Sequence, residues 1–125
     1  MTMLRIALGA MTSSASILTA IKAVHTLVWA FFAASILAIW VLAWRADFLN
    51  AALAISVVLV EVVILAANGL RCPLTSLAAR YTVDRRDNFD IYLPEWLARH
   101  NQLIFGALYG AGIVFTLARW MFATA

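Results

Sequence analysis

The apolar stretch AVHTLVWAFFAASILAIWVLAW, from Ala23 to Trp44, runs for 22 residues without a formally charged side chain. At about 1.5 Å per residue, a helix of this length crosses the hydrocarbon layer of a membrane, which is roughly 30 Å thick. Lys22 and Arg45 flank the stretch, and Trp40 lies near one end, where tryptophan favours the membrane–water interface. These features predict a membrane-spanning helix.

Two further stretches have the same character. Residues 51–70 contain a single charge, Glu61, and residues 103–122 contain one, Arg119, near their far end. The 125-residue chain is 66% hydrophobic and 12% charged, whereas a soluble domain typically has about 25% charged residues. Because so few charges cannot cover a water-facing surface, we expect the apolar excess to face lipid. The sequence therefore predicts one all-α integral membrane domain, a bundle of three transmembrane helices.

The segment before the first span is more polar. Ile17, Ile21 and Val24 fall at helical spacing, so we expect the first helix to cover residues 14–44. Residues 1–13 then form a separate N-terminal segment, or a fourth, half-inserted element over residues 4–10. The apolar run after Arg5 breaks at the sequence TSS with no small-x-small cleavage site, so we expect this segment to be retained.

The positive charges are distributed unevenly around the spans. Seven lie on the side shared by the N-terminus and the loop of residues 71–102, and two lie on the other side. By the positive-inside rule, the protein is predicted to lie in a bacterial inner membrane with a cytoplasmic N-terminus and 71–102 loop and a periplasmic C-terminus. The seven are Arg5, Lys22, Arg71, Arg80, Arg85, Arg86 and Arg99, and the two are Arg45 and Arg119. No basic run is interleaved with exposed aromatic residues, so we expect no nucleic-acid partner.

The 71–102 loop carries signals for short interfacial helices. Pro73 occupies a favoured first helical position, and we expect a short helix in CPLTSLAARY with Leu74, Leu77 and Ala78 turned toward the membrane. Pro94 begins a second helix, which continues without a break into the third span. Between them, TVDRRDNFD mixes both charge signs and predicts a salt-bridged, water-facing turn.

Small residues recur every four positions on two of the spans. They are Ala30, Ala34 and Ala38 on the first span, and Gly106 and Gly110 on the third. Such ridges let two helix backbones approach closely within a membrane, where lipid is as apolar as the side chains. We expect the first and third spans to pack on each other through these ridges, with a homodimer contact as the alternative.

Both histidines and the only cysteine are predicted to gather at one membrane face. His25 lies about one turn inside the first span, Cys72 follows the second span, and His100 precedes the third. A metal ion such as Zn²⁺ could bind all three, with Asp90 or Glu95 as a fourth ligand, although the short spacing of metal motifs is lacking. A b-type haem held between His25 and His100 is a second interpretation. In the third, His25 bonds a carbonyl or packs on an aromatic ring, and His100 is an interfacial polar residue.

Cys72 allows a functional and a structural interpretation. It precedes Pro73 at a helix start, where the helix dipole and the neighbouring Arg71 favour a reactive thiolate. Alternatively, a small and weakly polar side chain fits a crowded turn.

Glu61 lies near the membrane midplane, where a carboxylate costs on the order of 2.5–3.5 kcal/mol. We therefore expect it to face the bundle interior, where it relays protons, contacts a partner helix or accepts structural hydrogen bonds. The candidate donors for such bonds are Tyr109, Thr116 and Ser35.

The chain resembles a group of small bacterial membrane proteins of unknown function. They share a histidine in the first span, a short turn, a second span ending in Cys-Pro-Leu-Thr, a loop with a segment similar to NFDIYLP, and a last span. The resemblance covers about residues 24–92 and depends on His25 and the run Cys72 to Thr75. It implies a helical inner-membrane protein and no activity. EWLARHNQLIF departs from the pattern, so the resemblance assigns no role to His100.

Two functions remain open at this point. Motifs for serine hydrolases, phosphate-binding loops and zinc proteases are missing from the sequence, which disfavours an enzyme of those classes. The first hypothesis is a non-catalytic accessory or assembly subunit, packed in the lipid bilayer against other membrane subunits or against itself. The alternative is a small redox or ligand-binding protein that holds haem or a metal through His25 and His100, with Cys72.

Overall fold

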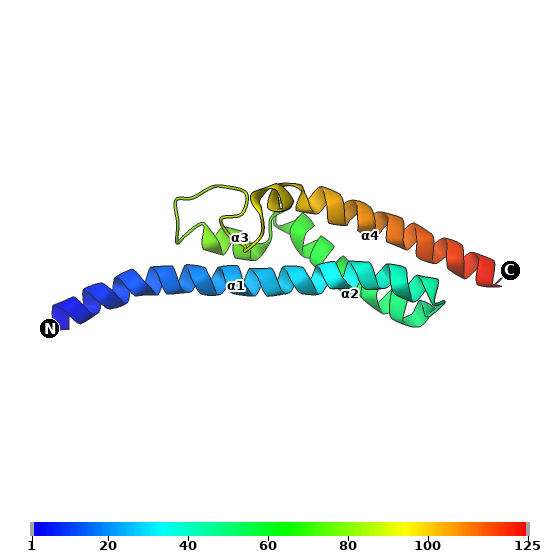
Figure 1. Cartoon of the computed structure of the whole chain (residues 1–125), viewed down its shortest axis with the longest axis horizontal. Helices are drawn as coiled ribbons and strands as arrows, with labels where there is room; N and C mark the ends of the chain where they lie inside the picture. The colour runs from blue at the N-terminus through cyan, green and yellow to red at the C-terminus, as the bar shows by residue number, and fades with distance from the viewer. Residues whose placement is uncertain (1, 125) are drawn as a thin grey trace.

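The computed structural model describes the backbone of residues 2–124 and the side chains of residues 15–123. The described chain forms four helices, and none of it forms a strand (Figure 1). They are α1 (Thr2–Trp44), α2 (Phe48–Ala67), α3 (Pro73–Ala78) and α4 (Glu95–Thr124). Residues Ala15–Trp44, Phe48–Ala67 and Glu95–Ala123 are each long and apolar enough to cross a membrane. The prediction of an all-α membrane protein with three spans is confirmed.

Helix α1 is longer than we predicted, because it begins at Thr2 and not near residue 14. Residues 4–10 are part of it, so they form no separate fourth element. The physical reason is local: the first 13 residues contain no proline, and their single glycine, Gly9, costs a helix only about 1 kcal/mol relative to alanine. The N-terminal part of α1 extends beyond the other helices at one end of the molecule (Figure 1).

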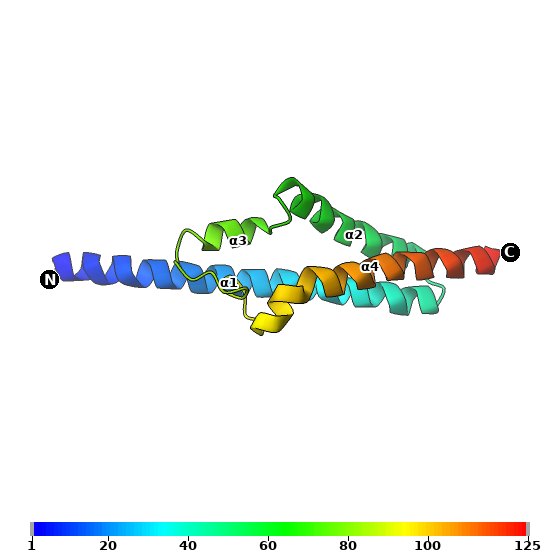
Figure 2. The ribbon, with the colours of Figure 1, turned by 90° about the horizontal axis from the view of Figure 1, so that it is seen from above.

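Helix α1 is the centre of the bundle. It packs against α2, α3 and α4, whereas α2 and α4 make few contacts with each other. Figure 2 shows α2 and α4 diverging toward the end of the molecule that carries α3. This divergence leaves room at that end for the cavity described below. The N- and C-termini lie at opposite ends of the molecule (Figure 1), as an odd number of spans requires.

Helices α1 and α4 pack through a narrow seam. Gly112 and Thr116 of α4 are buried, as are Ile39 and Ala43 of α1. The indole Nε1 of Trp40 donates to the Leu108 carbonyl at 3.2 Å, and the Trp40 ring stacks on Phe115 with centroids 5.1 Å apart. A Cβ atom at Gly112 would lie only 3.1 Å from Trp40 Nε1. The missing side chain at Gly112 therefore lets the two helices approach.

The predicted packing of the first and third spans through the two small-residue ridges is wrong. Ala30 and Ala34 are exposed, as are Gly106 and Gly110, and a Cβ at either glycine would meet nothing within 4 Å. The reason is the rotation of α4: its Gly112 face, and not its Gly106 face, meets the large Trp40 side chain. The alternative contact with another chain stays a prediction.

Charged side chains secure the hairpin between α1 and α2. Arg119 of α4 donates from Nε to the Ala43 carbonyl at 3.2 Å and from Nη2 to the Trp44 carbonyl at 2.7 Å. Its positive charge therefore satisfies orphan carbonyls at the negative end of the α1 dipole. Asp47 caps the start of α2 by accepting from the Asn50 amide.

The second and third spans differ in extent from the predicted residues 51–70 and 103–122. Helix α2 ends at Ala67 because Gly69 and Leu70 both adopt positive φ, +66° and +64°, which a right-handed helix cannot contain. Helix α4 begins at Glu95, directly after Pro94, and continues unbroken through the span, as we predicted.

Helix α3 begins at Pro73 with Cys72 as its N-cap residue, which confirms the predicted start of the short helix. Ala78 is fully buried, whereas Leu77 is exposed. In both ribbon views α3 runs along α1, whereas a helix lying in the membrane surface would run across it (Figures 1 and 2). The reason for the different orientation is that α3 packs on the long α1 helix.

Candidate functional site

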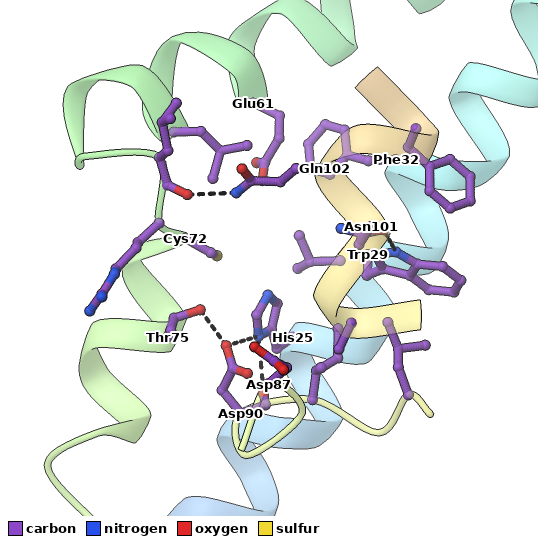
Figure 3. Close-up of a pocket in the computed structure, with 18 of the residues that line it drawn as sticks. His25, Trp29, Phe32, Glu61, Cys72, Thr75, Asp87, Asp90, Asn101 and Gln102 are labelled. Atoms are coloured by element: carbon purple, nitrogen blue, oxygen red, sulfur yellow. Dashed lines mark hydrogen bonds and ion pairs between the residues drawn. The ribbon is translucent and has the colours of Figure 1, made fainter. Parts of the chain in front are cut away.

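A cavity of about 700 Å³ lies where α2 and α4 diverge. Its walls come from α1, α2, α3, the connecting loop and the first turns of α4. Side chains from the spans line one part of it: Val28, Phe32, Ile36, Val58, Leu65 and Phe105. Polar side chains line the end beside α3, namely His25, Cys72, Thr75 and Asp90, and Glu61, Asn101 and Gln102 lie further along the wall (Figure 3). The cavity is therefore lined by apolar side chains from the spans and by polar side chains that gather beside α3.

His25 and Asp90 join α1 to the loop at this polar end. His25 Nδ1 lies 3.0 Å from the Asp90 carbonyl oxygen and 3.3 Å from Asp90 Oδ2. The carbonyl oxygen can only accept hydrogen bonds, and the same holds for Oδ2 when the carboxyl is ionised. We therefore infer that Nδ1 carries a proton.

Asp90 is held as a carboxylate. The residue is only 5% exposed, and the Thr75 hydroxyl donates to its Oδ2. Burial raises the pKa of Asp90, but hydrogen bonds from His25 and Thr75 and the nearby His25 charge outweigh burial and bring it below its usual value. Asp90 therefore stays ionised at neutral pH and fixes the orientation of His25.

The loop that carries Asp90 is docked on α1 by its neighbours. The Tyr92 amide donates to Thr26 Oγ1 at 2.9 Å, and Lys22 Nζ lies 4.5 Å from the centre of the Tyr92 ring. Ile91, which lies between Asp90 and Tyr92 in the sequence, is buried. These contacts explain why Asp90 reaches His25 although the two lie 65 positions apart in sequence.

Cys72 reaches the cavity through a tight elbow after α2. Gln102 Nε2 donates to the Leu70 carbonyl at 2.5 Å, and Asn68 Nδ2 donates to the Arg71 carbonyl at 2.7 Å. Together with the positive φ of Leu70, these bonds turn the chain so that the thiol points into the cavity on the side of His25 (Figure 3).

Glu61 is half-buried and lines the same cavity, as expected of a carboxylate that faces the bundle interior. The hydrogen-bond donors that we expected for it are wrong. Tyr109, Thr116 and Ser35 donate instead to backbone carbonyls of their own or a neighbouring helix, at 2.9, 2.7 and 2.8 Å. Among the residues that the structure describes, the Glu61 carboxylate has no hydrogen-bond donor.

His100 does not join His25 and Cys72. Its Nδ1 lies 2.8 Å from the Trp96 carbonyl of its own helix, the side chain is exposed, and it does not line the cavity. A haem between the two histidines therefore has no supporting geometry. Among the side chains that the structure describes, those of residues 15–123, no three His, Cys, Asp or Glu are arranged to hold a metal ion. The geometry of His100 agrees with the interfacial polar role.

The sequence marked some of these residues and missed others. His25, Cys72 and Glu61 were singled out, and Asp90 was considered only as a metal ligand. Asn101 was missed: its Oδ1 accepts a hydrogen bond from Trp29 Nε1 at 2.6 Å, and it lines the cavity. A signal was present, because an asparagine at the start of an apolar span requires a partner.

The charged turn agrees with the predicted salt-bridged, water-facing turn, except at Asp90. Asp84 pairs with Arg86 at 2.8 Å, and Asp87 pairs with Arg99 at 2.9 Å, all four side chains being partly or largely exposed. The Arg86 side chain and backbone amide lower the pKa of Asp84 to about 2. Asp90, at the end of the same stretch, is buried in the site.

Comparison of the chain with models of protein families, with characterised proteins and with solved structures finds no match. The function is therefore argued from the geometry of the cavity.

Proposed function

We propose that this protein binds an amphiphilic ligand, one long apolar chain with a polar end, at the cytoplasmic face of a bacterial inner membrane. The observation that carries the proposal is that apolar side chains from the spans and polar side chains beside α3 line one cavity. This develops the ligand-binding alternative from the sequence, without haem or metal. The orientation in the membrane follows from the distribution of positive charges.

The size and position of the cavity support this ligand class. About 700 Å³ falls within the roughly 300–1,000 Å³ of typical small-molecule pockets. Cys72, Thr75 and Asp90 of the polar end follow α2 and lie outside the apolar spans, so a bound headgroup would sit at the membrane boundary. Side chains of both α2 and α4, the two helices that diverge in Figure 2, line the cavity.

Cavity filling tests the proposal. Ala33→Trp places a large side chain in the wall of the cavity, whereas Leu37→Trp lies on the exposed side of the same helix and is the matched control. We expect the wild-type protein and Leu37→Trp to retain a bound amphiphile through purification in a mild detergent, seen by native mass spectrometry. Ala33→Trp should lose it. Equal occupancy in both variants would exclude the cavity as the binding site.

The accessory-subunit hypothesis remains as a second proposal, favoured by a different observation. Ala30, Ala34, Gly106 and Gly110 are exposed, and a Cβ at either glycine would meet nothing within 4 Å. Small-residue ridges of this kind suit a helix of another membrane subunit or a second copy. Gly110→Leu should abolish a stoichiometric complex isolated in mild detergent, with Leu103→Ala, another exposed change on α4, as the control. A complex that survives Gly110→Leu excludes that ridge.

A further inference from the structure

We propose that Cys72 accepts a long-chain acyl group as a thioester, with His25 as its base and Asp90 as the positioning residue. The inference rests on the proposed function, since the acyl donor is the amphiphile in the cavity. It adds covalent chemistry to binding, and it gives the single thiol a role.

The first support is the order of the three side chains. Asp90 holds the Nδ1 side of His25 through two contacts, at 3.0 and 3.3 Å. Nε2 is the ring nitrogen that does not contact Asp90, and the Cys72 thiol points into the cavity on the side of His25 (Figure 3). A nucleophile, a base and a carboxylate that orients the base form the arrangement used for nucleophilic catalysis by cysteine.

The second support is a hydrogen-bond donor for the acyl carbonyl. Trp29 donates to Asn101 Oδ1 at 2.6 Å, which fixes the amide so that its NH₂ group is on the other side. That NH₂ group has no hydrogen-bond acceptor among the described residues, and Figure 3 shows it on the cavity side of α4. A donor placed there stabilises negative charge that develops on a carbonyl oxygen.

The third support is the apolar part of the cavity, which lies next to the thiol. Phe32 of α1 and Val58 and Leu65 of α2 line it. An acyl chain placed there would direct its carbonyl carbon toward the polar end. Glu61 is the one carboxylate on the α2 wall of this part.

The chemical step balances without an oxidant or a reductant. The Cys72 proton passes to His25 Nε2, and Sγ forms a bond to the carbonyl carbon of the acyl donor. The bond from that carbon to the donor's sulfur breaks, and His25 returns the proton to the leaving thiolate. Exchange of one thioester for another conserves the bond type, whereas an oxygen ester would have to form a less stable thioester. We therefore assign the donor to the class of long-chain acyl thioesters.

The test uses the purified full chain in lipid nanodiscs with palmitoyl-coenzyme A as the probe. We expect one palmitoyl adduct by intact mass, removed by neutral hydroxylamine and missing in Cys72→Ala. In His25→Ala the rate of adduct formation should fall by about 100-fold, and added imidazole should restore part of that rate. Such rescue would not restore a purely structural histidine.

Asp90 is tested by its conservative replacement. Asp90→Asn should slow acylation, and Asp90→Glu should recover part of the rate, while Asp84→Asn, in the same loop but outside the cavity, should react as the wild type does. Retention of palmitate by each variant, measured by native mass spectrometry, shows that the fold and the cavity persist.

The outcomes separate the two proposals. A protein that retains palmitate but forms no adduct overturns the covalent step and leaves amphiphile binding intact. Failure to bind palmitate and to form the adduct overturns both. An adduct that forms from vesicle phospholipid without the coenzyme A thioester overturns the assigned donor class. Acylation of His25→Ala at the wild-type rate contradicts the role of His25 as the base.

Discussion

At the scale of single residues, Asp90 determines the form of the site. It is nearly fully buried, yet it stays ionised because His25 and Thr75 bond its carboxylate. A buried charge without these partners would cost several kcal/mol, on the order of what a small protein has in total stability. The same contacts attach the loop to α1 and α3, so site geometry and local stability depend on one carboxylate.

The pH dependence of stability follows from Asp90. Its pKa in the folded protein lies below the usual 3.8, so the ionised form stabilises the fold, and this contribution is present above pH 3.8. We expect the thermal unfolding temperature to fall as the pH drops below 3.8. Asp90→Asn should be less stable by about 1–3 kcal/mol at neutral pH and should lose this dependence.

The exposed pair of Asp84 and Arg86 is the control for that measurement. Asp84 also has a lowered pKa, about 2, but both partners are solvated, so the pair contributes little. In about 1 M salt, the attraction between the two charges is screened at separations beyond roughly 3 Å. An acid transition that disappears in Asp84→Asn and persists in Asp90→Asn would contradict the role of Asp90.

Leu70 gives a second prediction at this scale. Its φ of +64° costs a residue with a Cβ roughly 1–2 kcal/mol, and its side chain is 63% exposed, so little packing is at stake. Leu70→Gly should therefore be more stable than Leu70→Ala by about 1 kcal/mol in reversible unfolding. Equal stability of the two variants would show that the elbow relaxes in the wild type.

At the scale of elements, the contact between α1 and α4 depends on one glycine. Gly112 is the only one of the four described glycines at which a Cβ would meet another side chain, and the nearest atom belongs to Trp40 of α1. Trp40 is itself held by Leu108 and Phe115. The seam is therefore rigid on both sides and sets the rotation of α4.

Gly112→Ala and Gly110→Ala form a matched pair for this seam. We expect Gly112→Ala to destabilise the bundle by about 1–3 kcal/mol because Trp40 must move. Gly110→Ala meets open space and should be neutral or stabilising by up to about 1 kcal/mol, since alanine favours the helix. Denaturation by a strong detergent, followed by circular dichroism, measures both. Equal destabilisation would instead indicate a packing partner for Gly110.

At the scale of the whole molecule, three antiparallel spans place the loop and the α1–α2 turn at opposite ends (Figure 1). Impermeant maleimide labelling tests this in a Cys72→Ala background. Arg80→Cys and Ala46→Cys are both exposed positions, one at each end. We expect Arg80→Cys to label from the cytoplasmic side and Ala46→Cys from the periplasmic side. Labelling of both from one side would contradict three spans.

Much of this architecture could be predicted because it depends on local properties of the chain. The length and apolarity of residues 23–44, the helix start at Pro73 and the unbroken helix from Pro94 onward all follow from neighbours in sequence. The faces through which α1 and α4 pack could not be predicted. Alanines and glycines at four-residue spacing are present on faces of these helices that do not meet.

The sequence by itself determined the number of spans, their helical character and the placing of His25 and Cys72 toward one end, since bilayer thickness and helix rise set these properties. Only the tertiary structure decided that Asp90 rather than His100 is the partner of His25, because that choice depends on the rotation of each helix and on the docking of a loop 65 positions away. Rotation is set by side-chain contacts such as the one between Trp40 and Gly112, and no periodicity within a single helix contains that information.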